Sequence, residues 1–188
     1  MSSIRALLVD LDGTLVDTRE ANSGSYLEAL DEIGVAVDLA TFESIAAARN
    51  WRQFLPVLMP DHTDAARERV VTRKAAIYRE RIGATTVNSG LVALISSMRP
   101  ACRTALVTTA SASSVNVILA HHQLTHLFDT TVTGDDVARH KPDPEAYALA
   151  AGRLHVAAAE CLIFEDSDIG VSAATAFGAP TLRMAFPI

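Results

Sequence analysis

Residues 7–17 read Leu-Leu-Val-Asp-Leu-Asp-Gly-Thr-Leu-Val-Asp, and the interpretation of the whole chain starts from this stretch. The apolar residues 6–9 predict a buried strand. Asp10 and Asp12 follow two positions apart, so strand alternation would point both to one side. Two acids beside apolar residues are costly unless a cation or phosphate chemistry uses them. The alternative is a plain strand end with a glycine turn, in which aspartate supplies turn hydrogen bonds.

The composition excludes several classes of protein. Hydrophobic residues make up 49% of the 188 residues, enough for a sizeable core, and the formal net charge of −6 disfavours nonspecific nucleic-acid binding. No apolar run approaches the ~18 residues of a membrane span, and Asp10 and Asp12 interrupt any signal-peptide core. Cys102 and Cys161 form no C-x-x-C motif, so reduced buried thiols are expected. We expect a soluble cytoplasmic protein, a monomer or weak dimer, without nucleic-acid or membrane partners.

The chain divides after its first strand into two kinds of pattern. Residues 18–88 show helical periodicity without a clear strand, in three successive segments that end near residues 34, 60 and 83. From residue 89 onward, helical patterns alternate with strands at 104–107, 130–133, 161–164 and 181–184. This alternation predicts an α/β fold with a parallel sheet. Residues 1–17 and 89–188 are expected to form the sheet core, and residues 18–88 an inserted α-helical domain.

Two later helices carry recognisable start signals. Asp143 and Pro144 are expected as the N-cap and first residue of one helix. Asp168 is expected to cap the next helix, which should end at Gly178.

Two threonines and one lysine come after predicted strands. Ligands of parallel sheets bind at the carboxyl ends of the strands, so these residues are candidate ligand contacts. Thr108 and Thr109 come directly after the strand at 104–107, and a hydroxyl with nearby turn N–H groups can donate to phosphate oxygens. Lys141 lies in the proline-rich loop 140–144. Taken singly, these segments are better interpreted as a helix cap and a solvated loop lysine.

A second acidic pair ends the strand at 161–164. Glu165 and Asp166 repeat the unusual arrangement of Asp10 and Asp12, and parallel strands would bring all four acids to one edge. Like charges ~4 Å apart repel by about 4 kcal/mol at an effective dielectric constant near 20, so a cation is needed. Oxygen ligands favour Mg²⁺.

Together, the four segments resemble the four motifs of the haloacid dehalogenase (HAD) superfamily in order and approximate spacing. The resemblance covers nearly the whole chain. It implies a Rossmann-like parallel sheet with a helical cap of the C1 type at residues 18–88. It also implies a Mg²⁺-dependent phosphatase for a small phosphorylated metabolite, such as a sugar or polyol phosphate, acting through an aspartyl-phosphate intermediate.

The resemblance implies a chemical role for each motif residue. Asp10 is the expected nucleophile, and Asp12 the general acid and base. Thr108, Thr109 and Lys141 are expected to neutralise the phosphoryl oxygens.

The resemblance also implies a metal site. The carboxylates of Asp10 and Asp166 and the backbone carbonyl of Asp12 are expected to hold Mg²⁺, and Glu165 to act through a water molecule. Asp168 is a further acid in this region, although a helix cap is the better interpretation.

Specificity is expected to lie in the cap. The segment around Arg49 loosely resembles that of the β-phosphoglucomutase-like subfamily, where an arginine stands near this position. Arg49 is therefore a candidate substrate contact, with a basic helix face as the alternative. Lys74 is another possible contact, for which a solvated face is the preferred interpretation. The subfamily commonly has a histidine where this chain has Asn22, which disfavours a phosphomutase, the alternative function. A non-enzymatic binding protein is disfavoured further, because the motif acids and lysine are intact.

Overall fold

The computed structural model describes residues 3–47 and 49–186, and the chain forms two units. The sheet unit comprises Met1–Asp17 and Thr86–Ile188, and the helical unit comprises Thr18–Thr85. Among the described residues, no helix combines the length and apolar character that a membrane crossing requires.

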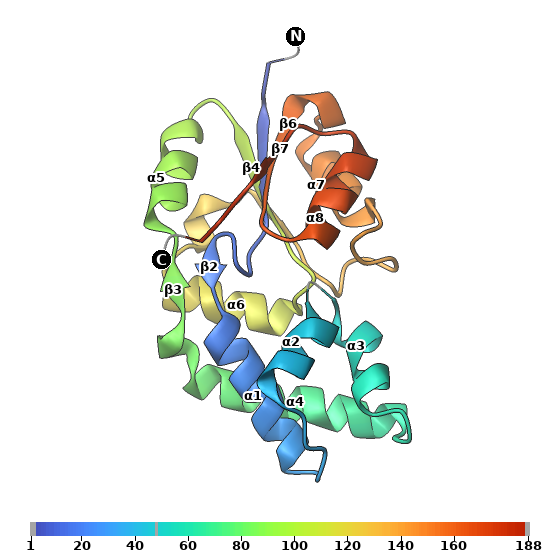
Figure 1. Cartoon of the computed structure of the whole chain (residues 1–188). Helices are drawn as coiled ribbons and strands as arrows, with labels where there is room; N and C mark the ends of the chain where they lie inside the picture. Colours follow the sequence, from blue (N-terminus) through green and yellow to red (C-terminus); the bar gives the residue numbers. More distant parts are fainter. Residues whose placement is uncertain (1–2, 48, 187–188) are drawn as a thin grey trace. The chain divides into compact units, whose positions relative to one another are not determined.

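The sheet unit, in which Figure 1 labels β4, β6 and β7, is built on five parallel strands in the order β5-β4-β1-β6-β7. The central strand β1 (Ala6–Val9) pairs with β4 (Arg103–Val107) and β6 (Cys161–Glu165). The outer strands are β5 (Thr130–Val132) and β7 (Thr181–Arg183). Every residue of β1 is buried, as expected for a parallel strand covered on both faces.

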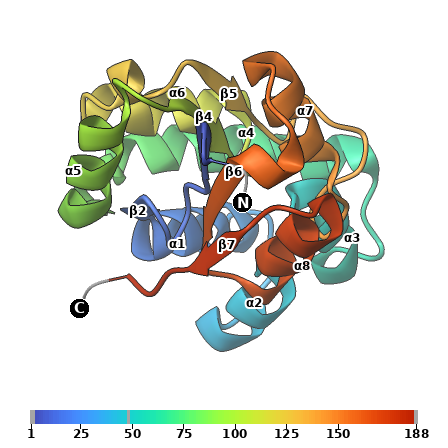
Figure 2. The ribbon, with the colours of Figure 1, turned by 90° about the horizontal axis from the view of Figure 1, so that it is seen from above.

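Helices cover both faces of the sheet (Figure 2). One face carries α5 (Ser89–Met98) and α6 (Ala112–His121), and the other carries α7 (Glu145–Leu154) and α8 (Asp168–Phe177). Alternation along β1 directs Ala6 and Leu8 into the core cluster that α7 and α8 complete. Short 3₁₀ helices lie at Ile82–Ala84, Thr125–Leu127 and Ala158–Glu160.

Residues 18–88 contain a strand that the sequence analysis missed. β3 (Thr86–Val87) pairs antiparallel with β2 (Val16–Asp17) in a separate two-stranded sheet. Two residues are too few to show the alternation of apolar and polar side chains that predicts a strand. This strand is defined by its pairing with β2, which is distant in the sequence.

The predicted helix starts are each displaced by one residue. Ser167, not Asp168, caps α8, because the Ser167 Oγ accepts the Gly170 N–H at 3.0 Å. Pro144 occupies the N-cap position of α7, and the Asp143 carboxylate accepts the Glu145 N–H at 2.9 Å from one position earlier. The end of α8 at Gly178 is confirmed, and its φ of 85° is the left-handed conformation that favours glycine.

The described residues of the helical unit form four α-helices where three segments were expected. They are α1 (Arg19–Asp31), α2 (Leu39–Ala46), α3 (Trp51–Leu58) and α4 (Asp64–Glu80). The predicted middle helix is divided because Asn50 and Gln53 form a capping box that starts α3. The rings of Tyr26, Phe42 and Phe54 pack together with centroids 5.1–5.7 Å apart.

The interpretation of Lys74, on α4, as part of a solvated face is wrong. Its side chain is buried, and its Nζ lies 4.9 Å and 4.3 Å from the ring centroids of Tyr26 and Tyr78. Lys74 is four residues after Val70 and four before Tyr78, so it lies on the apolar face of the helix. The aromatic faces stabilise its ammonium by cation–π attraction.

Candidate active site at the carboxyl end of the sheet

The ends of three adjacent strands bring the motif residues of the sheet unit together. Asp10 follows β1, and its N–H continues the ladder to the Phe164 carbonyl at 3.0 Å. Thr108 follows β4, whereas Glu165 is the last residue of β6. The loop that follows β5 contributes Lys141.

Lys141 is held by three acceptors, which match its three ammonium protons. Its Nζ donates to Asp10 Oδ1 at 2.7 Å, to the Val107 carbonyl at 3.1 Å and to Glu165 Oε1. The residue is 2% exposed, so its interpretation as a solvated loop lysine is wrong. Burial alone would lower the pKa of Lys141, but Asp10 and Glu165 raise this pKa well above the ordinary value. Lys141 therefore remains charged.

Three carboxylates converge beside this lysine. Oxygens of Asp10, Glu165 and Asp166 all lie within 4.8 Å of one another. Burial and the neighbouring Glu165 raise the pKa of Asp10 well above its usual value, and the same two causes raise the pKa of Asp166. Three acids against one ammonium leave an excess of negative charge in a buried place.

This donor set fits a divalent cation. Carboxylate oxygens are hard ligands of the kind that Mg²⁺ prefers, and a double positive charge would offset the excess negative charge. Asp168 does not belong to the set, because its side chain is 86% exposed and forms an ion pair with Arg183 on β7.

The end of β4 positions Thr108 next to Asp12. Thr108 is buried, its Oγ1 accepts the Ala110 N–H at 3.0 Å, and it donates to Asp12 Oδ2 at 3.4 Å. The partly buried Thr109 lies in the same turn. A hydroxyl and a carboxylate therefore face each other at the edge of the site.

Gly13 and Thr14 position Asp166. The Thr14 hydroxyl donates to Asp166 Oδ1 at 3.2 Å. Gly13 has a φ of 84°, and a Cβ placed on it would lie 2.4 Å from Asp166 Oδ2. Gly13 and Thr14, which follow the two aspartates of the first motif, thus allow this motif to pack closely against Asp166 of the last motif.

Tyr147 and Ser167 are two further parts of this site, which the sequence patterns did not indicate. Tyr147 Oη donates to Glu165 Oε1 at 2.8 Å, and Ser167 donates to Glu165 Oε2 from its N–H at 3.3 Å and its Oγ at 3.2 Å. Burial chiefly raises the pKa of Tyr147, so the hydroxyl keeps its proton. A tyrosine on a buried face needs a hydrogen-bond partner, which was the available signal.

Arg49 belongs to the helical unit and is exposed. Its Nη1 donates to the Ile45 carbonyl at 2.5 Å, one of the last carbonyls of α2. The guanidinium therefore caps a helix end in this structure.

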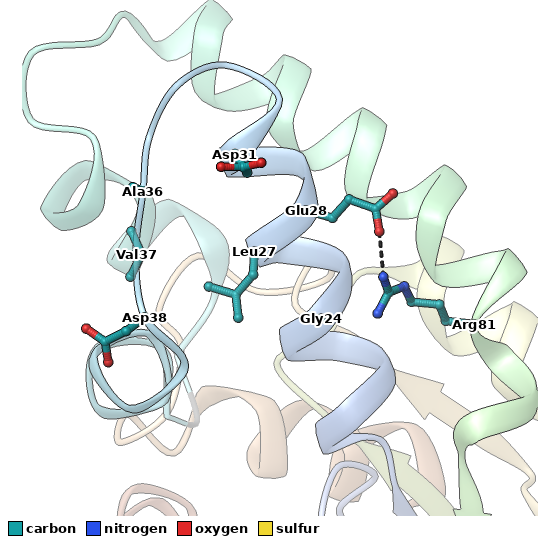
Figure 3. A pocket seen from close by; sticks show the side chains of 8 residues that line it. All are labelled: Gly24, Leu27, Glu28, Asp31, Ala36, Val37, Asp38 and Arg81. Atoms are coloured by element: carbon teal, nitrogen blue, oxygen red, sulfur yellow. Dashed lines mark hydrogen bonds and ion pairs between the residues drawn. The ribbon is translucent and has the colours of Figure 1, made fainter.

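A hollow of about 650 Å³ lies between α1, the 36–38 loop and Arg81 in the helical unit (Figure 3). Its walls carry three acids, Glu28, Asp31 and Asp38, and Arg81 already forms an ion pair with Glu28. This charge distribution disfavours an anionic ligand. The hollow is therefore a poor candidate for binding a phosphate ester.

The sheet unit has the fold of an α/β enzyme, with clustered acids and a charged lysine at the ligand-binding edge. The family profile of haloacid dehalogenase-like hydrolases matches residues 4–178. The chain belongs to this family, which confirms the resemblance and fold class predicted from the sequence and establishes it as a hydrolase rather than a binding protein.

Similar proteins include named phosphatases. Fructose-1-phosphate phosphatase YqaB of Escherichia coli K12 is 28% identical over 172 residues, which cover 92% of each chain. Hexitol phosphatase A of the same organism is 31% identical, covering 97% of this chain and 84% of that protein. The crystal structure of CbbY from Rhodobacter sphaeroides in complex with phosphate superposes with a TM-score of 0.86 at 25% identity, covering 95% of this chain and 84% of that chain.

Proposed function

We propose that this hydrolase is a Mg²⁺-dependent phosphatase that hydrolyses a small sugar or polyol phosphate through an aspartyl phosphate on Asp10. The observation that carries the proposal is the buried contact of 2.7 Å between Lys141 Nζ and Asp10 Oδ1, next to further acids. A cation thus lies where a phosphoryl group bonded to Asp10 would carry its negative oxygens. The substrate class follows the names of the two E. coli relatives, a fructose-1-phosphate phosphatase and a hexitol phosphatase.

Asp10 and Asp12 divide the chemistry. An Asp10 oxygen attacks phosphorus while the bond to the leaving oxygen breaks, and Asp12 gives that oxygen a proton. Asp12 then removes a proton from the water molecule that attacks the aspartyl phosphate. Phosphate leaves, and both carboxyl groups return to their starting states. The Thr108 hydroxyl, 3.4 Å from Asp12 Oδ2, supports the orientation of this acid.

Phosphate binding is assigned to Lys141, Thr108 and Thr109. Lys141 supplies a charge that burial protects from solvent screening, and the two threonines supply donors from the turn after β4. Fixed donors around a transferring phosphoryl group are the main source of catalysis in such reactions.

The carboxylates of Asp10 and Asp166 and the backbone carbonyl of Asp12 would hold Mg²⁺. When bound, the ion would neutralise the phosphoryl oxygens and the excess carboxylate charge. Glu165 was predicted to reach the metal through water, and this stays a prediction. A water molecule would have to replace one of the donors that its oxygens already accept.

Residues 18–88 are proposed to act as a C1-type cap on a core formed by residues 1–17 and 89–188. Within it, Arg49 is proposed to contact the part of the substrate remote from the reacting phosphate. To do so, its guanidinium would leave the Ile45 carbonyl, a contact that is exposed and therefore weak.

The proposal is tested with a panel of sugar and polyol phosphates, including fructose 1-phosphate and hexitol phosphates, assayed with Mg²⁺. Free phosphate is expected to accumulate stoichiometrically with substrate loss. An Asp10→Asn preparation, purified identically, controls for contaminating phosphatases. Isomerised sugar phosphate forming faster than free phosphate would favour the phosphomutase instead, a function that Asn22 disfavours. No release from any phosphate ester would overturn the proposal.

A further inference from the structure

Glu165 is a carboxylate of the site whose two oxygens are both fully hydrogen-bonded. It is 1% exposed, and each oxygen has two donor atoms: Lys141 and Tyr147 at Oε1, and the Ser167 N–H and Oγ at Oε2. A carboxylate has about four lone-pair sites, so these donors use its capacity. A Cβ on Gly170 would lie 2.0 Å from the Glu165 carboxyl group, so α8 closes the remaining side.

Lys141 is shared between this carboxylate and the proposed nucleophile. Its Nζ contacts Asp10 Oδ1 and Glu165 Oε1 at the same time. Both partners are buried anions, so a small shift of the ammonium toward one weakens its contact with the other. How strongly Glu165 attracts Lys141 therefore decides how much of the lysine charge is available beside Asp10.

Tyr147 acts on the same oxygen that Lys141 uses. Its Oη donates to Glu165 Oε1, and its ring centroid lies 5.0 Å from Lys141 Nζ. The side chain is fully buried, and the Phe177 ring packs near it at 6.4 Å between centroids. Packing alone would be served by phenylalanine, and a buried hydroxyl is tolerated only with a partner. The hydroxyl therefore points to a polar role.

We propose that Tyr147 is a positioning residue: its hydroxyl occupies Glu165 Oε1 and so keeps the Lys141 ammonium available to Asp10 and to the phosphate. The role rests on the proposed function, because it assumes that phosphate binds beside Asp10. Tyr147→Phe removes one donor from Oε1 and leaves the ring. Glu165 then attracts Lys141 more strongly, and phosphate binding weakens.

The test uses inorganic phosphate as the probe and measures its dissociation constant by titration calorimetry with the Mg²⁺-loaded protein. Tyr147→Phe is expected to weaken phosphate binding about tenfold, the range of one hydrogen bond to a charged group. Phe177→Leu is the matched packing control: it alters the contact of the same ring without touching Glu165. It should lower the melting temperature and leave the phosphate constant within about twofold of the wild-type value.

A second comparison separates positioning from packing. In a Glu165→Gln background, the negative charge through which Tyr147 acts is gone, so adding Tyr147→Phe should cause no further loss of phosphate affinity. Equal losses from Tyr147→Phe in both backgrounds, or equal losses from Tyr147→Phe and Phe177→Leu, would overturn the role of Tyr147. So would an unchanged constant for Tyr147→Phe in an enzyme whose wild type binds phosphate. A wild-type protein that neither binds phosphate nor releases it from esters would instead remove the proposed function, and this inference with it.

Discussion

The ammonium of Lys141 lies 2.7 Å from the Asp10 carboxylate, although the two residues are 131 positions apart. Both side chains are buried, so the pair is shielded from the water and salt that weaken surface ion pairs. Removing one partner of a buried pair leaves an uncompensated charge, which lowers the free energy of unfolding by about 3–5 kcal/mol. Losing either partner is therefore expected to affect both the stability and the proposed chemistry, and variants must be checked for both.

Replacing Lys141 by methionine should reduce kcat/KM by roughly 10²- to 10³-fold, the loss expected for one transition-state donor. Methionine retains an unbranched apolar stem, so circular dichroism should show a folded protein with a lower melting temperature. Arg139→Met, in the same loop but exposed and paired with Asp143, is the matched control and should be nearly neutral. A loss below about fivefold for Lys141→Met would contradict its assigned role.

Asp10→Asn should abolish nearly all turnover, because the amide is a poor nucleophile in the place of the carboxylate. The fold should persist, since the side chain keeps its size and one like charge leaves a crowded group of acids. Phosphate release and the melting temperature measure the two effects. Mass spectrometry must exclude deamidation back to aspartate, and substantial activity in such a sample would mean another nucleophile.

Metal removal should abolish activity, and Mg²⁺ should restore it, because the acids at the sheet edge carry excess negative charge. Asp166→Ala should raise the Mg²⁺ concentration required for half-maximal activity by at least about tenfold, an effect expected from losing one direct ligand. Asp168→Ala is the control: this exposed acid pairs with Arg183 and should not alter the requirement. Full activity in a chelated sample would disprove the metal assignment.

Gly170→Ala should destabilise the protein, because the new Cβ would collide with the Glu165 carboxyl group at 2.0 Å. We expect a loss of at least about 1 kcal/mol, visible as a melting temperature lower by ~2–4 °C or more. Gly152→Ala, in the last turn of α7 with open space around the added Cβ, should instead stabilise by ~0.5–1 kcal/mol. Thermal unfolding of both variants measures these effects. Equal changes in melting temperature would contradict the close approach of Gly170 to the Glu165 carboxyl group.

Arg49→Ala should change the preference among sugar and polyol phosphates more than it changes the hydrolysis of a small artificial ester. The artificial ester lacks the remote group that a cap contact would bind, so it has less binding energy to lose. Arg103→Ala is the control, because it removes an arginine charge at the amino end of β4, whereas the candidate site lies at the carboxyl ends of the strands. Equal losses on every substrate would indicate that Arg49 acts on the reacting phosphate or on the fold.

The amino-acid sequence by itself determined the sheet, the family and the residues of its four motifs. These features are local: an apolar run predicts its own strand, and Asp10, Glu165 and Asp166 stand directly at strand ends. The helix that ends at Gly178 follows from a local rule as well, because a left-handed residue is needed there. The sequence determined the helix boundaries less well. Ser167 caps α8 instead of the predicted Asp168, and a capping box at Asn50 divides the predicted middle helix of the helical unit into two.

Only the tertiary structure decided which of these groups touch each other. Lys141 contacts Asp10 and Glu165, and Tyr147 contacts Glu165, across sequence separations of between 18 and 131 positions. Of the residues that donate to Glu165, Ser167 alone is close to it in the sequence. Lys74 shows the same limit, because its burial depends on the rings of Tyr26 and Tyr78. Local patterns record the preference of each segment for helix, strand or turn. Hydrogen-bond partners and burial depend on which side chains meet across the fold, and that is set by packing.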